Sequence, residues 1–191
     1  MSNNRKTRFP VKRLVLDAIL IAIYVVLGAW RIPIGNMLRV SVAPFAVILC
    51  ALTFGPVDGM IVGFFGEFIT QVTGPYGLTV TTPLWCLGEF LRGGSLGLLA
   101  WLFMKNWIKD GWKISGKQLL VLMASCLLTG VLASFGNTLA LYVDSKMFGY
   151  YEYHVVFGIL AVRLCLNGAT ACLLAYIALP ILSALKKAKL I

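Results

Sequence analysis

The stretch from Pro83 to Met104, PLWCLGEFLRGGSLGLLAWLFM, is apolar almost throughout and has the length that a helix needs to cross a lipid bilayer. Its two charged residues, Glu89 and Arg92, stand three positions apart, and the pair Gly93-Gly94 follows them. An ionisable side chain within a membrane is costly, so by default it faces a bundle interior or a wet cavity and marks a functional site. The stretch therefore predicts a membrane helix that carries part of a polar site.

The composition of the whole chain agrees with a membrane location. The 191 residues are 60% hydrophobic and 13% charged, whereas a soluble domain is nearer half apolar and a quarter charged. We predict an all-α integral membrane protein with a single domain over residues 1–191. The six predicted spans are Leu14–Ala29, Arg39–Phe54, Val57–Val72, Pro83–Met104, Gln118–Tyr142 and Val155–Leu185. The second and third are shorter than the roughly 20 residues of a straight span, which allows for a broken or incomplete crossing.

The basic residues set the predicted orientation. Twelve of the 17 Lys and Arg residues lie in the tail 1–13, in the loop 105–117 and after residue 185. Cytoplasmic segments carry an excess of Lys and Arg, so we predict that both termini and the loop 105–117 are cytoplasmic. The same pattern accounts for the net charge of +10 and leaves no support for nucleic-acid binding.

Several classes of site have no support in the sequence. The five cysteines form no CxxC pair and lie in apolar surroundings, which favours packing roles over a metal site. The chain contains no G-x-x-x-x-G-K-[ST] loop, no HExxH and no GxSxG, so ATP binding of the Walker type and the common hydrolase motifs are excluded. We also see no separate signal peptide before the first apolar run.

With this orientation, a set of polar side chains from four spans falls in the outer half of the membrane. They are Glu67, Glu89, Arg92, Asn137 and Arg163. At 1.5 Å per residue, Glu89 and Arg92 lie roughly 9 and 13 Å below the outer end of their span. One interpretation is a buried network that locks helices together, with Glu89 and Arg92 neutralising each other. Convergence of the set at one depth favours a cavity open to the outside, with Arg92 as a ligand contact and Glu89 as its partner.

Aromatic residues gather in the outer loops above this predicted cavity. Trp30 follows the first span, Tyr76 and Trp85 flank the start of the fourth, and the segment 148–154 precedes the sixth. Such residues are typical of the interfacial belt of a membrane protein. They also suit the walls of a small-molecule site. Both interpretations stay open on the sequence alone.

Three local features resemble a known family. The first is Ala18-Ile-Leu-Ile-Ala22, whose small residues four apart would let another helix approach closely. The second is Leu38-Arg-Val-Ser-Val-Ala-Pro-Phe45, which leads to Leu52-Thr-Phe-Gly-Pro-Val-Asp-Gly-Met-Ile-Val-Gly63. The third is Tyr76-Gly-Leu-Thr-Val-Thr-Thr-Pro-Leu-Trp85 followed by Arg92-Gly93. Together they resemble the substrate-binding (S) components of energy-coupling factor (ECF) vitamin transporters.

The resemblance implies a role and partners. S components are six-helix proteins of the bacterial cell membrane that capture a vitamin and work with a transmembrane coupling subunit and two cytoplasmic ATPases. ATP hydrolysis then drives the S component to topple and release the vitamin inside. In this chain Ala18 and Ala22 would dock on the coupling subunit, and no cofactor is implied. The implied ligand contacts are Arg92, Asn137, Arg163, Glu67, Trp85, Tyr76 and Trp30.

The resemblance leaves the vitamin open. Folate members usually carry a Phe-Pro-Gly-Phe-Thr-like run before the fourth span, where this chain has Pro75-Tyr-Gly-Leu-Thr79. An anionic vitamin would suit Arg92 and Arg163, because guanidinium binds carboxylate in a bidentate manner. We predict pantothenate, with folate, cobalamin and a pyridoxine-like compound as alternatives. A membrane enzyme built on Glu67, Glu89 and Arg92, or a structural partner with a locked polar network, are the competing classes.

Overall fold

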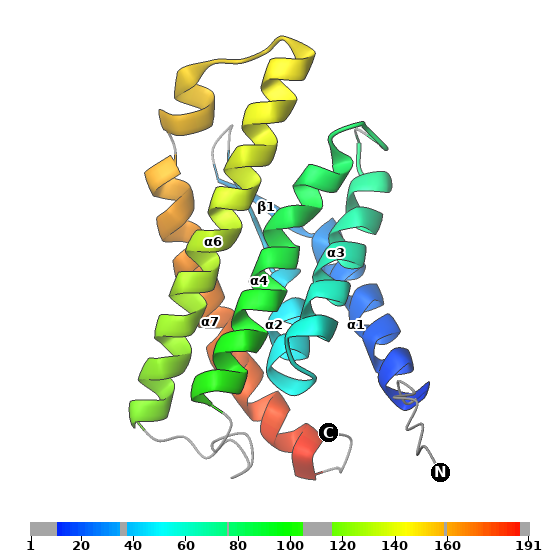
Figure 1. Cartoon of the computed structure of the whole chain (residues 1–191), viewed down its shortest axis with the longest axis vertical. Coiled ribbons are helices and arrows are strands. Elements are labelled where there is room, and N and C mark those ends of the chain that lie inside the picture. Colours follow the sequence, from blue (N-terminus) through cyan, green and yellow to red (C-terminus); the bar gives the residue numbers. More distant parts are fainter. Residues whose placement is uncertain (1–10, 35–37, 76, 105–115, 159, 188–191) are drawn as a thin grey trace, which may run out of the picture.

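The structure is a computed structural model that describes residues 11–34, 38–75, 77–104, 116–158 and 160–187. Figure 1 shows an elongated bundle of helices, in which the start of α1 and the end of α7 lie at the same end. The α-helices of the described part are α1 (Val11–Ala29), α2 (Pro44–Thr53), α3 (Pro56–Val72), α4 (Thr82–Phe103), α6 (Gly116–Phe148) and α7 (Leu160–Lys187). The prediction of six helices, the first beginning and the last ending on the same side of the bundle, is confirmed.

The predicted second span, Arg39–Phe54, is wrong at its beginning. Leu38–Ser41 forms strand β2, which pairs antiparallel with β1 (Arg31–Ile34) in the register Arg31 to Ser41. The alternation of apolar and polar residues in Leu38-Arg39-Val40-Ser41 suits a strand, and the helix begins at Pro44, whose fixed φ fits the first helical turn. The helix α2 is therefore ten residues long, or about 15 Å, and covers only part of a bilayer.

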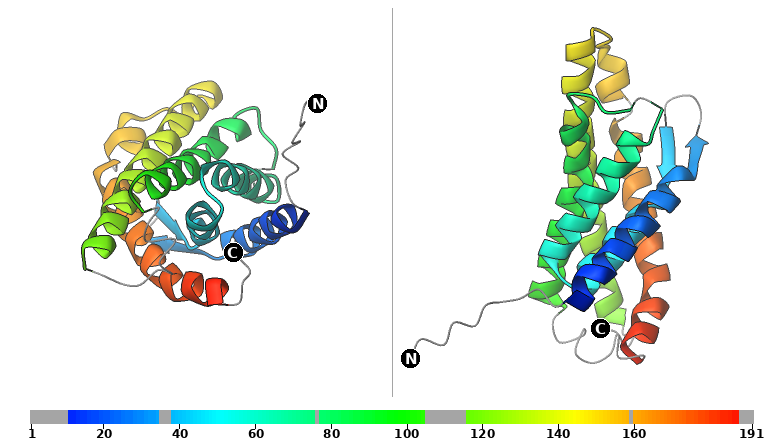
Figure 2. Two further views of the ribbon diagram at one scale, coloured as in Figure 1. Left: turned by 60° about the horizontal axis from the view of Figure 1, so that its bottom comes forward. Right: turned by 90° about the vertical axis from the view of Figure 1, so that its right-hand side faces the viewer.

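The short helix α2 forms the centre of the bundle. It contacts α1, α3, α4 and α7, and all of its residues from Ala46 to Leu52 are buried. A helix that is apolar all round requires burial on every side, which the sequence PFAVILCALT provides. The left view in Figure 2 shows α2 surrounded by the longer helices. The apolar core of the fold therefore lies around α2.

A polar cluster joins α1, α2 and α3 at the end of the bundle where α1 begins. The turn between α2 and α3 contains Gly55 with φ of +101°, where a side chain would be strained, and Pro56 begins α3. Arg13 of α1 forms an ion pair with the buried Asp58 of α3 and donates a hydrogen bond to the carbonyl oxygen of Phe54. The ion pair and the hydrogen bond tie the start of α1 to this turn.

The helix α6 is much longer than a bilayer is thick. Its 33 residues span about 50 Å, against about 30 Å for the hydrocarbon core, and it ends before Gly149, which has φ of +78°. Among the described residues, two segments are long and apolar enough to cross a membrane, namely α6 and His154–Leu185. The predicted sixth span, Val155–Leu185, corresponds to η1 (His154–Gly158) and α7. Of the predicted loop 105–117, residues 105–115 lie outside the described residues.

Candidate functional site

A cavity of about 480 Å³ lies in the half of the bundle away from the α2–α3 turn. The C-terminal halves of α1, α3 and α6, the N-terminal halves of α4 and α7, strand β2 and the start of α2 line it. Its volume falls within the roughly 300 to 1,000 Å³ of small-molecule sites. Under the predicted orientation this half faces the outside of the cell, so the cavity lies where the sequence placed the polar residues.

Two glycines allow polar side chains to reach the cavity. A Cβ atom on Gly66 would lie 2.7 Å from the ring of Tyr24, so the bare backbone of α3 lets this ring pack against it. A Cβ atom on Gly88 would lie 2.2 Å from Oδ1 of Asn137, which enters from α6. Any larger residue at either glycine would displace the side chain opposite it.

The middle of the cavity holds the predicted ion pair. Nε of Arg92 lies 3.2 Å from Oε2 of Glu89, and the two residues are 2% and 6% exposed. The prediction that Glu89 partners Arg92 is thus confirmed. In the described part of the chain neither of these two atoms has a hydrogen-bond partner, so the contact is one of charge rather than of hydrogen-bond geometry. The pair brings no net charge to the cavity.

One side of the cavity is anionic. Glu67 of α3 accepts a hydrogen bond from the Tyr24 hydroxyl on Oε2, at 2.7 Å, and one from the Gln71 side-chain amide on Oε1, at 2.5 Å. Tyr24 is 2% exposed, and Gln71 stands one helical turn beyond Glu67. Among the described residues no Lys or Arg forms an ion pair with Glu67. Its carboxylate is thus fixed in position without being neutralised.

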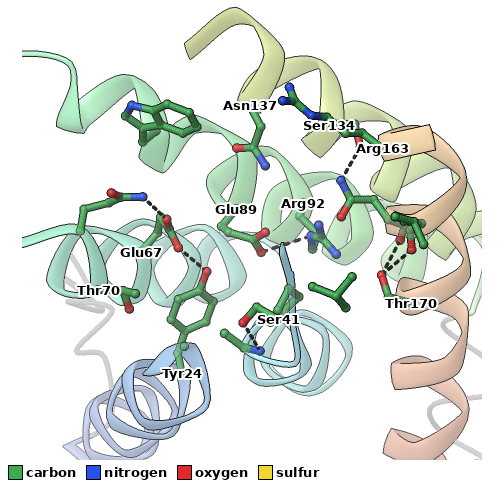
Figure 3. A pocket seen from close by; sticks show the side chains of 18 of the residues that line it. Tyr24, Ser41, Glu67, Thr70, Glu89, Arg92, Ser134, Asn137, Arg163 and Thr170 are labelled. Atoms are coloured by element: carbon green, nitrogen blue, oxygen red, sulfur yellow. Dashed lines mark hydrogen bonds and ion pairs between the residues drawn. The ribbon is translucent and has the colours of Figure 1, made fainter. Parts of the chain in front are cut away.

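The other side of the cavity is cationic. Arg163 of α7 has its guanidinium 3.5 Å from the carbonyl oxygen of Val155, and no described carboxylate pairs with it. Beside it, Asn167 donates a hydrogen bond of 2.7 Å to the hydroxyl of Ser134, which joins α7 to α6. Figure 3 shows Glu67 and Arg163 on opposite sides of the cavity, with Glu89, Arg92 and Asn137 between them.

The predicted site residues divide into three groups. Five of them, Arg92, Asn137, Arg163, Glu67 and Trp85, line the cavity together. Trp30 follows α1, is 76% exposed and does not line it. Tyr76 lies outside the described residues. Ligand binding by the five lining residues stays a prediction, but the structure brings them to one place.

Sequence reasoning missed further polar lining residues. They are Tyr24, Ser41, Thr70, Gln71, Ser134 and Thr170. The spacing of Gln71 four residues after Glu67 was the available signal, since residues four apart share one face of a helix. Tyr24 could not be found in this way, because its role depends on how α1 is turned against α3.

The two serines that line the cavity are engaged in hydrogen bonds. The Ser134 hydroxyl donates to the carbonyl oxygen of Gly130 and accepts from Asn167, and the Ser41 hydroxyl accepts from the backbone of Ala43. Neither serine is poised against a general base. In the described part of the chain no group of three or more His, Cys, Asp and Glu side chains could hold a metal ion.

Aromatic residues at the outer end contact one another rather than the cavity. The Lys146 amine lies 3.9 Å from the ring centre of Tyr151, and Tyr142 packs edge-on against the same ring, at 5.6 Å between ring centres. Asp144 of α6 accepts hydrogen bonds from Tyr150 and from Thr81, which precedes α4. This cluster joins the outer ends of α4 and α6, and its aromatic rings do not line the cavity.

The predicted docking residues lie on the surface of the bundle. Ala18 and Ala22 are exposed on α1, whereas Tyr24 and Gly28 of the same helix are buried and line the cavity. The small-residue strip therefore faces away from the cavity. Its docking role stays a prediction.

Comparison with known proteins gives one consistent result. A family described as "ECF transporter, substrate-specific component" matches residues 12–185. UPF0397 proteins of Streptococcus pneumoniae strains CGSP14 and P1031 are each 32% identical over 136 residues, which is 68% of this chain and 71% of theirs.

Solved structures show the same fold. The S component of a bacterial ECF transporter superposes with a TM-score of 0.64 at 22% identity, covering 93% of this chain and 96% of that one. The S component for biotin from an ECF-type ABC transporter gives a TM-score of 0.61 at 18% identity, covering 98% and 95%. At these identities the likeness concerns the fold.

Proposed function

Because the chain belongs to the substrate-specific components of ECF transporters, we propose that it captures a water-soluble vitamin, with pantothenate as the best candidate. Members of this family are membrane-bound transport subunits rather than enzymes, and they bind a vitamin and work with an ECF module. We place this chain in a bacterial cell membrane as a multi-pass protein. Its module would consist of a transmembrane coupling subunit and two cytoplasmic ATPases.

Arg163 is the residue that supports pantothenate as the vitamin. Arg163 lines the cavity, its guanidinium has no described carboxylate partner, and guanidinium binds carboxylate strongly and in a bidentate manner. Pantothenate has one carboxylate, which one unpaired guanidinium matches. Folate has two carboxylates, and pyridoxine has none. Cobalamin is several times larger than pantothenate and suits a cavity of about 480 Å³ less well.

A first prediction concerns the vitamin directly. Pantothenate at 100 times its dissociation constant should raise the free energy of unfolding of the purified chain by about 2.7 kcal/mol. The measurement is a thermal-shift screen in detergent that includes folate, cobalamin and pyridoxine. A larger shift with one of these would reassign the vitamin. No shift with any vitamin would count against vitamin capture itself.

A second prediction concerns docking. Ala22→Trp should lower the yield of the complex with the ECF module by about ten-fold or more, because the bulky ring prevents close approach of another helix. The measurement is the amount of ATPase that co-purifies with the tagged chain. Leu128→Trp is the matched control, since Leu128 is exposed on α6 instead of α1. Equal yields from both variants would contradict docking through α1.

A further inference from the structure

We propose that the cavity selects a bipolar ligand, with Glu67 as the residue that recognises hydrogen-bond donors at the end remote from the ligand's anionic group. This inference rests on the proposed function of the cavity as a vitamin site. It adds a second requirement to the carboxylate that Arg163 would bind. The ligand must also carry hydroxyl, amide or ammonium donors at its other end.

The first step is the state of Glu67. A carboxylate is an acceptor with about four lone-pair sites. The Tyr24 hydroxyl and the Gln71 amide occupy one site on each oxygen, and Glu67 lines the cavity. The remaining sites can accept hydrogen bonds from a ligand. Glu67 can offer no donor of its own while it is ionised.

The second step is the rigidity of this acceptor. Tyr24 is almost fully buried, and its ring lies against the bare backbone at Gly66. Gln71 comes from the next turn of α3. Two donors from two helices therefore fix both oxygens of Glu67 before any ligand arrives. Such preorganised polar groups fix the orientation of a ligand at low entropic cost.

The third step is the separation of charge across the cavity. Glu89 and Arg92 form an ion pair in the middle, so their charges cancel there. Glu67 and Arg163 lie on opposite sides of the cavity (Figure 3), and neither forms an ion pair within the described part of the chain, so their opposite charges are not cancelled. A ligand with an anion at one end and donors at the other fits in one direction only. A ligand with anions at both ends is repelled by Glu67, which is a specificity element of the repulsive kind.

The test compares three compounds by isothermal titration calorimetry on the purified full-length chain. Pantothenate has both features, panthenol lacks the carboxylate, and N-pivaloyl-β-alanine keeps the carboxylate and amide but has no hydroxyl group. We expect the unmodified chain to bind pantothenate about ten-fold or more tightly than either analogue, because an unpaired buried polar group is costly.

Two variants should then give opposite patterns. Glu67→Gln should reduce the preference for pantothenate over N-pivaloyl-β-alanine to about three-fold or less, while the preference over panthenol persists. Arg163→Gln should remove the preference for pantothenate over panthenol and keep the preference for pantothenate over N-pivaloyl-β-alanine. Glu152→Gln and Lys187→Gln change the same charges at exposed positions outside the cavity and should leave all affinities unchanged. Elution of each variant as a single species checks that it is folded.

The outcomes separate this inference from the proposed function. If Glu67→Gln weakens all three compounds equally, or leaves both preferences intact, the role of Glu67 is overturned while pantothenate binding stands. If pantothenate does not bind, its assignment fails, and the pair biotin with biotin amide decides the bipolar requirement, because biotin carries ureido N–H donors at the end remote from its carboxylate. Binding of biotin amide as tightly as biotin would overturn that requirement, and binding of neither would overturn both proposals.

Discussion

Gly93→Ala is expected to destabilise the folded chain by about 3 kcal/mol, because it forces α3 and α4 apart. A Cβ atom on Gly93 would lie 2.1 Å from the carbonyl oxygen of Gly59 and 2.3 Å from its carbon. Both are backbone atoms, which no rotamer change can move. The reverse contact is also close, since a Cβ atom on Gly59 would lie 2.8 Å from the carbonyl oxygen of Gly93. The measurement is the apparent melting temperature in detergent.

The neighbouring glycine provides the matched control. A Cβ atom on Gly94 would meet the side chain of Met60, with Cγ at 2.8 Å and Sδ at 2.9 Å. Methionine is flexible and can move aside, so Gly94→Ala should change stability by no more than about 1 kcal/mol. Equal effects of the two substitutions would mean that α3 and α4 do not meet through Gly93.

Arg92→Met is expected to destabilise the chain by about 3 to 5 kcal/mol, because it leaves the carboxylate of Glu89 buried without its cation. Glu89 is 6% exposed, and Arg92 is its only ion-pair partner among the described residues. The double variant Glu89→Leu with Arg92→Met removes both charges and should recover most of this loss. Thermal unfolding of the two variants, compared with the unmodified chain, provides the measurement.

The double variant also separates stability from function. It should fold but bind the vitamin less tightly, since Arg92 lines the cavity and its guanidinium has donors beyond Nε. A single Arg92→Met variant with unchanged stability would show that Glu89 is not held by this pair. A stable double variant with full affinity would remove Arg92 from the ligand contacts.

The sequence was most informative where hydrophobicity is continuous. The predicted span Val57–Val72 begins one residue after α3 and ends with it. The predicted span Pro83–Met104 is shifted by one residue from α4 at both ends. The second span was predicted too long because Val40 and Val42 continue the apolar run of α2 back into the hairpin. Pro44 was the boundary signal, since proline is favoured in the first turn of a helix. Pairing with β1 could not be deduced, because it depends on contacts across the loop.

The ionisable residues of the site could be predicted from the sequence, whereas most of its other polar residues could not. Glu67, Arg92 and Arg163 stand out in apolar helices, and depth from the membrane surface was enough to group them. Tyr24 does not stand out in this way, because tyrosine is common near the ends of membrane helices. The division of the cavity into a cationic and an anionic side was also hidden. The pairing of Glu89 with Arg92 was predicted, but only the spatial structure shows that Glu67 and Arg163 have no ion-pair partner among the described residues and lie on opposite sides of the cavity.

The shortness of α2 has a consequence for how a solute can leave the protein. The cavity reaches down to Ala43 and Pro44, where α2 begins, and below that point the packed residues Ala46 to Leu52 fill the centre of the bundle. The polar cavity thus occupies one half of the bundle, and the apolar core around α2 fills the other half. A path to the far side of the membrane would require α2 to leave the core, and the chain would lose the packing free energy of several buried side chains. We therefore expect that release on the far side requires a movement of the chain as a whole rather than a pore past α2.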